Sequence, residues 1–176
     1  MQNIFSVVYN DKGSTLVIGL LTMVLLSLIG VSATTTSRVE IQISGNDKTY
    51  KEAFYAAELG LTTGETTVEA LLNRVALEEE TTTGRYSQGT EPRWDALKWD
   101  ATDSVAVPLT NIPTGLSSVA VPPRYTIEQR TFRRDSLTTG IAVPTGVYLF
   151  NVMSQGTGGS TSAEAVLQTI YAKRFD

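Results

Sequence analysis

An uncharged hydrophobic block near the N-terminus constrains this chain more than any other stretch. Residues 14–33 are STLVIGLLTMVLLSLIGVSA, and no charged residue follows before Arg38. At about 1.5 Å of rise per residue, a helix of this length measures roughly 30 Å, which matches the hydrocarbon core of a bilayer. The block therefore predicts one membrane-spanning helix. The side chains that we assign to its surface are Leu16, Val17, Ile18, Leu20, Leu21, Val24, Leu25 and Leu28.

The rest of the chain has the composition of a water-soluble domain. The sequence has 176 residues, with 14 basic and 18 acidic side chains and a net charge of -4. This length suggests one small globular head attached to the helix. Because the basic residues form no stripe that could neutralise a phosphate backbone, nucleic acid is not a predicted partner.

The chain has no cysteine and no histidine. Disulfides, thiolate nucleophiles, imidazole bases and the zinc sites built from these ligands are therefore excluded. Gly156–Ser160 superficially suggests a phosphate loop, but β-like sequence continues on both sides, so we interpret it as a hairpin turn. The spacing of Asp95, Asp100 and Asp103 fixes no two carboxylates on one face. The sequence predicts no enzyme, no cofactor and no metal site.

The order of the N-terminal segments differs from that of a secretory signal. Such a signal places its cleavage site after an apolar stretch of about 7–15 residues. Here a polar segment, residues 1–13, comes first and ends in Lys12 and Gly13, before a longer apolar block. We therefore expect the apolar block to be retained. Lys12 weakly favours an inside N-terminus, although Asp11 and Arg38 leave the charge difference small.

The stretch from Lys12 to about Leu61 resembles the N-terminal segment of PilX-type minor type IV pilins. It consists of KGSTLVIGLLTMVLLSLIGVSATTTSRVEIQISGNDKTYKEAFYAAELGL. Its more specific parts are Gly45-Asn46-Asp47 and Ala56-Ala57-Glu58. The C-terminal part, from Val147 onward, is similar to the hairpin that such proteins often carry.

The resemblance implies how the chain is processed and where it acts. A leader, residues 1–13, would be removed by a prepilin peptidase after Gly13, and the new first residue, Ser14, would be methylated. The protein would be a single-pass inner-membrane protein with its head in the periplasm, and later a subunit of an extracellular pilus. The implied partners are the prepilin peptidase, other minor pilins, the major pilin and a PilY-type tip adhesin.

One position departs from the pattern of most pilins. They carry a glutamate as the fifth residue of the mature chain, where this sequence has Ile18, and PilX-type segments commonly lack it too. A carboxylate buried in hydrocarbon without a partner is costly, so a subunit with no preceding neighbour is better without one. We therefore expect this chain to prime assembly and to lie at or near the pilus tip, supporting adhesion or twitching motility.

A helical period continues beyond the hydrophobic block. Apolar and small residues recur four and three positions apart, which aligns one narrow face of a helix to about residue 76. We expect the helix to loosen at Thr34–Ser37, and Gly60 and Gly64 to weaken it further. Glu58 lies off this face, where it either contacts a neighbouring subunit or is solvated. The residues predicted to pack on the head are Tyr50, Phe54, Ala57, Leu61, Gly64, Val68, Leu71 and Val75.

The last third of the chain has the pattern of antiparallel strands. Arg124–Arg134 alternates between apolar and polar residues, and Gly146–Ser154 and Ala163–Arg174 are rich in β-forming residues. The loop 155–162 joins the last two segments. Ser104–Thr110 is a candidate for a further strand.

These elements predict an α+β architecture. By the resemblance it is the type IV pilin fold, in which a long N-terminal helix packs on a small antiparallel sheet. The proline-rich part of the head is expected to form loops. The predicted organisation is a leader over 1–13, a membrane or filament-core helix over 14–34, an amphipathic helix over 35–76, and a head over 77–176 with loops at 85–123 and a β-meander at 124–176.

Two other functions remain open at this point. A minor pseudopilin of a type II secretion system shares the same N-terminal features. A membrane-tethered receptor or sensor would keep its helix in the bilayer and would retain residues 1–13. The PilX-type resemblance favours the pilus.

Overall fold

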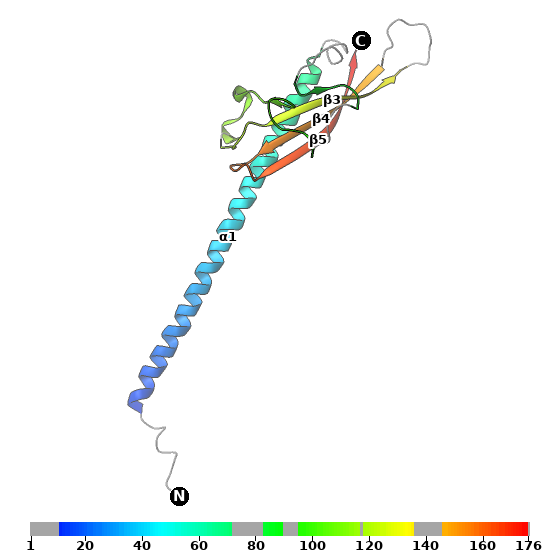
Figure 1. The fold of residues 1–176 in the computed structure, drawn as a ribbon. Helices are drawn as coiled ribbons and strands as arrows, with labels where there is room; N and C mark the ends of the chain where they lie inside the picture. Colours follow the sequence, from blue (N-terminus) through cyan, green and yellow to red (C-terminus); the bar gives the residue numbers. More distant parts are fainter. Residues whose placement is uncertain (1–10, 72–82, 90–94, 117, 136–145, 176) are drawn as a thin grey trace, which may run out of the picture. The chain divides into compact units, whose positions relative to one another are not determined.

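The computed structural model describes residues 11–71, 83–89, 95–116, 118–135 and 146–175. The chain forms two compact units, Met1–Asn46 and Asp47–Asp176. One helix, α1 (Asp11–Glu69), contributes its first part to the first unit and its last part to the second (Figure 1).

The helix is continuous through the threonine-rich stretch where the sequence predicts loosening. Thr34 and Thr35 each donate a hydroxyl hydrogen bond of 2.9 Å to Val31 O. Thr36 donates one of 3.1 Å to Ser32 O. Since the hydroxyls bond to carbonyls of the preceding turn, they are satisfied without opening the helix.

The end of α1 comes earlier than the periodicity predicts. The helix ends at Glu69, before the predicted limit near residue 76. The chain then leaves through Ala70 and Leu71, whose amides bond to Thr66 O at 3.0 Å and to Val68 O at 3.1 Å. Val75, the last predicted packing residue, lies outside the described residues.

The second unit contains one mixed sheet in the order β1-β3-β4-β5, with β2 also paired to β3. β1 runs parallel to β3, and the other pairs are antiparallel. The β3–β4 register shifts once, between Gln129 and Thr131. The strands are β1 (Arg85–Tyr86), β2 (Val105–Ala106), β3 (Arg124–Arg134), β4 (Gly146–Thr157) and β5 (Glu164–Phe175), and two short 3-10 turns, η2 (Leu109–Asn111) and η3 (Thr114–Leu116), lie between β2 and β3.

The sheet packs its core on the last part of α1. Ile127 of β3 lies opposite Val152 of β4, and the two side chains are buried, at 1% and 0% exposure. Phe150 is also fully buried and lies in the same cluster as Val68 of α1. Tyr148 extends the cluster, since its ring stacks on that of Phe132 at 4.3 Å. The alternation of strand residues thus places one sheet face against the helix.

The predicted α+β fold is confirmed, with one difference in the sheet. The three long strands form the predicted meander, and β4 extends to Thr157, past its predicted end at Ser154. β2 lies within the candidate segment Ser104–Thr110. The parallel strand β1 makes the sheet mixed, which the sequence did not indicate because two residues carry no readable alternation.

Candidate assembly surface

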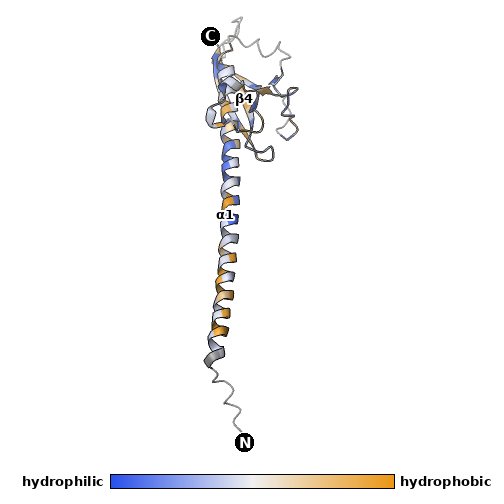
Figure 2. Cartoon of the chain, turned by 90° about the vertical axis from the view of Figure 1, so that its left-hand side faces the viewer, coloured by the Kyte–Doolittle hydropathy of each residue, from blue (hydrophilic) through white to orange (hydrophobic). Residues whose placement is uncertain are grey.

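Large apolar side chains cover the first part of α1. All those predicted for the surface of this helix are exposed, from 49% for Val24 to 73% for Leu16. Figure 2 shows the hydrophobic colour concentrated in the N-terminal part of α1. Within the described part of the chain, α1 is the one helix long and apolar enough to cross a membrane. Such a surface is unfavourable in water and is stable only when lipid or other helices cover it.

Two polar side chains in the middle of this apolar stretch are satisfied within the helix. Thr22 Oγ1 donates to Gly19 O at 2.9 Å, and Ser27 Oγ donates to Met23 O at 2.7 Å. In hydrocarbon an unpaired hydroxyl would be costly because no water replaces the lost hydrogen bond. Thr22 and Ser27 are therefore suited to an apolar environment.

The predicted processing residues lie in the first turns of α1. Gly13 and Ser14 are both exposed. A β-carbon on Gly13 would meet no atom within 4 Å outside the neighbouring helix backbone. Ile18, the fifth residue counted from Ser14, is 57% exposed. The chain leaves this region accessible to another protein, and cleavage there stays a prediction.

In the second unit, α1 touches β4 through residues with little or no side chain. A β-carbon on Gly156 would lie less than 3.0 Å from the backbone of both Ala53 and Ala57. A β-carbon on Gly158, just after β4, would lie equally close to Thr49 O. Main chain therefore meets main chain here, which only the smallest residues permit. We call this contact the small-residue seam and define it as Thr49, Ala53, Ala57, Gly60 and Gly64 on one side and Val152, Ser154, Gly156 and Gly158 on the other.

The two helix glycines belong to this seam. A β-carbon on Gly60 would clash with Ser154 Oγ, and one on Gly64 would clash with Val152 Cγ1. Both glycines were predicted to weaken the helix, and only Gly64 was also placed on the packing face, whereas in the structure both pack closely against β4. Ser154 Oγ is the one buried side-chain polar atom without a hydrogen-bond partner among the described residues.

The packing face differs from the predicted one at its N-terminal end. Ala57 and Val68 are fully buried, and Leu61 and Leu71 are partly buried against the core. Tyr50 and Phe54, however, are 60% and 40% exposed. Because β4 approaches the backbone of α1 so closely, alanine and glycine occupy the contact and the aromatic rings lie beside it.

The C-terminal end of α1 is bonded to β5 by one lysine. Lys173 Nζ donates to Val68 O at 3.0 Å, to Leu71 O at 2.7 Å and to Glu69 O. These carbonyls belong to the last turn of α1 and to the residue two positions after it, at the negative end of the helix dipole, where a cation is favourable. Lys173 Nζ also lies 5.1 Å from the ring centroid of Phe175. This role could not be predicted from the sequence, because over a hundred residues separate Lys173 from its partners.

Tyr171 adds a second bond at the same helix end. Its hydroxyl donates to Glu69 Oε2 at 2.8 Å. This hydrogen bond to a carboxylate is the main reason that the pKa of Tyr171 is raised above its usual value.

Glu58 lies on the exposed side of α1, at a groove of about 460 Å³. The helix contributes Tyr55, Glu58, Leu59 and Thr62 to the groove, and the segment around η3 contributes Pro113, Gly115 and Leu116. Glu58 is therefore accessible to another chain, and its predicted role in a subunit contact stays a prediction.

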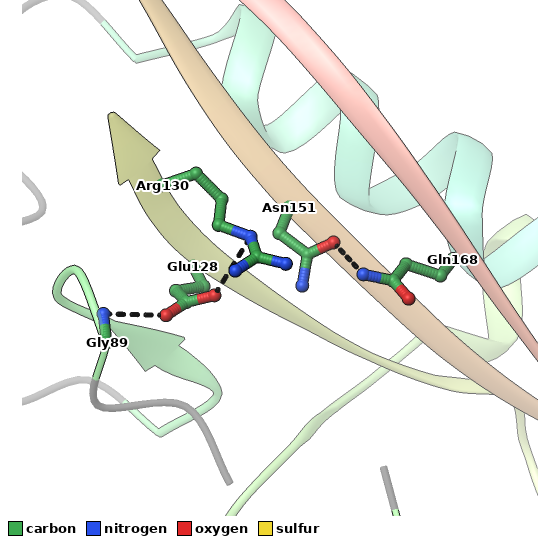
Figure 3. Close-up of polar contacts among 5 residues, drawn as sticks. All are labelled: Gly89, Glu128, Arg130, Asn151 and Gln168. Atoms are coloured by element: carbon green, nitrogen blue, oxygen red, sulfur yellow. Dashed lines mark hydrogen bonds and ion pairs between the residues drawn. The ribbon is translucent and has the colours of Figure 1, made fainter. Parts of the chain in front are cut away.

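The sheet face opposite α1 carries polar contacts around two buried side chains, Glu128 and Asn151 (Figure 3). Glu128, only 5% exposed, accepts a hydrogen bond of 2.8 Å from Gly89 N and lies 3.7 Å from Arg130 Nε. Gln168 Nε2 donates to Asn151 Oδ1 at 2.5 Å. These contacts link neighbouring strands and hold the turn at Gly89 against the sheet.

Arg124 fixes the segment before β2. Its Nε donates to Ser104 Oγ at 2.7 Å, and its Nη2 donates to Asp100 O at 2.6 Å and to Ser104 O. Burial lowers the pKa of Arg124. The hydrogen bonds from Thr102 lower the pKa of Asp100.

In the described ranges no three carboxylate side chains are grouped so that they could hold a metal ion.

The comparison with known protein families identifies the N-terminal part of the chain. Residues 12–62 match the family described as PilX N-terminal. Searches of curated proteins and of solved structures returned no match. The matched range contains the exposed apolar part of α1 and the α1 residues of the seam up to Gly60. The apolar surface that lipid or other helices must cover therefore lies within the family segment. Residues 12–62 of the chain are therefore similar to the N-terminal segment of the PilX family.

Proposed function

We propose that this chain is a minor pilin of a type IV pilus. The observation that carries the proposal is the exposed apolar surface over residues 14–33, which lies inside the segment that matches PilX N-terminal. In the bilayer, lipid covers this surface. In a filament, like helices replace the lipid, and van der Waals packing between them drives assembly.

In this proposal the prepilin peptidase cuts after Gly13 and Ser14 is then methylated. The head lies in the periplasm while residues 14–34 span the inner membrane, and it becomes extracellular when the chain enters the pilus. The proposed partners are other minor pilins, the major pilin and a PilY-type tip adhesin. The exposure of Gly13 and Ser14 supports the processing step.

Intact-mass measurement and N-terminal sequencing test this proposal. We expect the protein from sheared surface filaments to begin at Ser14 and to carry one added methyl group. A chain that begins at Met1 and occurs only in the membrane fraction would instead indicate a tethered receptor. A chain that begins at Ser14 but accumulates in a secretion pseudopilus, and not in pili, would indicate a pseudopilin.

The proposed position of the chain is at or near the pilus tip. Ile18 supports this position, because a subunit without a preceding neighbour needs no carboxylate to pair with that neighbour's amino terminus. Immunogold labelling should place the wild-type protein at filament ends. We expect the Ile18→Glu variant to enter the shaft as well, whereas wild-type protein spread evenly along shafts would overturn the proposal.

Glu58 is the proposed contact with a neighbouring subunit. Its groove is lined by the Glu58 carboxylate and by the apolar side chains of Tyr55 and Leu116, among others. Glu58→Lys should therefore lower the amount of protein recovered in sheared filaments while its level in the membrane stays unchanged. Thr110→Lys, on an exposed residue outside the groove, is the matched control.

A further inference from the structure

Among the residues that the structure describes, one edge of the sheet is open along β5. The strand order places β5 at the end of the sheet, and no strand of the described residues pairs with its outer edge. β5 pairs with β4 from Glu164 to Phe175 without a register shift. Sheet edges are usually protected by proline, a bulge or an inward-pointing charge. Residues 165–172 contain no proline and no charge, so another strand can add to this edge.

We propose that this edge binds β5 of a second copy of the chain, antiparallel and about a two-fold axis at Thr169. In this register, Glu164 of each copy lies opposite Arg174 of the other. Residues directly opposite in an antiparallel pair share one sheet face and interact. The uncharged centre meets itself and the opposite charges meet at both ends. The other pairs are Ala165 with Lys173, Val166 with Ala172, Leu167 with Tyr171, and Gln168 with Ile170.

The charged residues at the strand ends are available for this contact. Glu164 is exposed, with one oxygen 2.9 Å from Gln155 Nε2. The Arg174 side chain is 57% exposed and pairs with Asp135 at 3.0 Å. In the proposed pair, Arg174 and Glu164 of the second copy approach from the open edge of β5. The bonds of Glu164 to Gln155 and of Arg174 to Asp135 can therefore persist beside the new ion pairs.

The same edge carries a projecting apolar side chain and a hollow. Ile170 is 63% exposed on the face opposite α1. A cavity of about 370 Å³ lies beside the strand and is lined by Met153, Glu164, Val166, Leu167 and Gln168. In the proposed register Ile170 of the second copy lies opposite Gln168 and diagonal to Val166, within reach of this cavity. The two-fold axis produces this contact twice, because both copies use the same surface in an isologous interface.

The direction of β5 decides which copies can pair. β5 runs in the same direction as residues 47–69 of α1, because Gly158 lies at Thr49 and Lys173 lies at the end of the helix. In an antiparallel pair these helix segments run in opposite directions. Subunits along one filament repeat with one direction, so this contact joins chains that are not neighbours in the same filament.

Disulfide crosslinking of the full chain in detergent tests the two-fold axis. The sequence has no cysteine, so each variant carries a single thiol. Thr169→Cys places two β-carbons roughly 5 Å apart in the pair, which suits a disulfide. Ala172→Cys is the matched control on the same strand, because its two copies lie about 20 Å apart in this register. We expect Thr169→Cys to give crosslinked dimer and Ala172→Cys to stay monomeric under the same oxidant.

A charge exchange tests the register by analytical ultracentrifugation. Glu164→Arg and Arg174→Glu should each raise the dimer dissociation constant about fivefold or more, because two ion pairs become repulsive. The double variant should return to within about twofold of wild type, since its opposite charges are restored between copies while the bond to Asp135 stays lost.

Three results would overturn this proposal. They are equal crosslinking of the two cysteine variants, a wild-type chain that is monomeric at all concentrations, and a double variant whose dimer dissociation constant is no lower than those of the two single variants. None of these measurements depends on filament assembly, so they can fail while the proposed pilin function stands.

Discussion

The hydroxyl of Ser154 is buried against Gly60 without a hydrogen-bond partner. An unsatisfied buried hydroxyl costs about 1–3 kcal/mol. Ser154→Ala should therefore raise the free energy of unfolding by about 1 kcal/mol in urea titrations. Ser104→Ala is the control, because Ser104 is equally buried but bonds to Arg124 and to Asp100 O. We expect the control to lose about 1–2 kcal/mol, and equal effects of the two changes would contradict this interpretation.

The seam makes a second prediction for single residues. In Gly156→Ala the new methyl group meets the backbone of Ala53 and Ala57, which cannot move aside as a side chain can. Overpacking of this kind costs about 1–3 kcal/mol. Thermal unfolding should show a lower Tm for Gly156→Ala. Gly159→Ala, where the nearest atom is 3.5 Å away, should change the Tm little.

At the scale of residues, the sequence predicts which segment is apolar better than it predicts which side chains face the sheet. The charge-free block identified the exposed helix because twenty consecutive uncharged and mostly apolar residues allow few other uses. The predicted packing face included Tyr50 and Phe54, since periodicity favours large apolar residues. Periodicity could not show that the sheet would come close enough to require Ala53 and Gly60 in the contact. Backbone contact leaves no apolar signal in the sequence.

Among the elements, the end of α1 depends on β5. Lys173→Met keeps most of the unbranched side chain but removes the bonds to the three carbonyls at the end of α1. We expect a loss of about 1–2 kcal/mol and faster amide exchange in residues 66–71. Lys51→Met is the control, because Lys51 makes an exposed ion pair with Asp47 in the same helix. Unchanged exchange in Lys173→Met would show that the helix end is held by other contacts.

The bond between Tyr171 and Glu69 predicts a loss of stability at high pH. The pKa of Tyr171 is raised in the folded chain from about 10, so the bond contributes fully below pH 10. This contribution is lost as pH rises through the raised pKa, when the phenolate meets the Glu69 carboxylate. Urea unfolding between pH 8 and 11 should show a smaller decline in Tyr171→Phe than in wild type. Parallel declines would exclude this cause.

The long strands were predictable as elements and the short ones were not. β3, β4 and β5 each extend over more than ten residues, which is enough for alternation and β-propensity to agree. β1 and β2 have two residues each, and their pairing is decided by the neighbouring β3. The loop interpretation of Gly156–Ser160 was only partly right, because Gly156 and Thr157 belong to β4.

At the scale of the whole molecule, the two units predict separable behaviour. The core cluster and the sheet lie entirely within Asp47–Asp176. A variant that lacks residues 1–46 should therefore fold without detergent, with a cooperative thermal transition seen by circular dichroism. Gly156→Ala in this variant should lower its Tm as in the full chain. A non-cooperative transition would show that the first unit is needed for folding.

The contacts of Lys173 also set an order of events during translation. Its bonds close a loop of more than a hundred residues, so the ribosome makes α1 long before the strand that holds its end. Contacts of such long range form late in folding. The apolar helix can thus enter the membrane while the second unit is still incomplete. A premature stop codon before β5 would leave an inserted chain with an unfinished sheet, a substrate for quality-control proteases at the membrane.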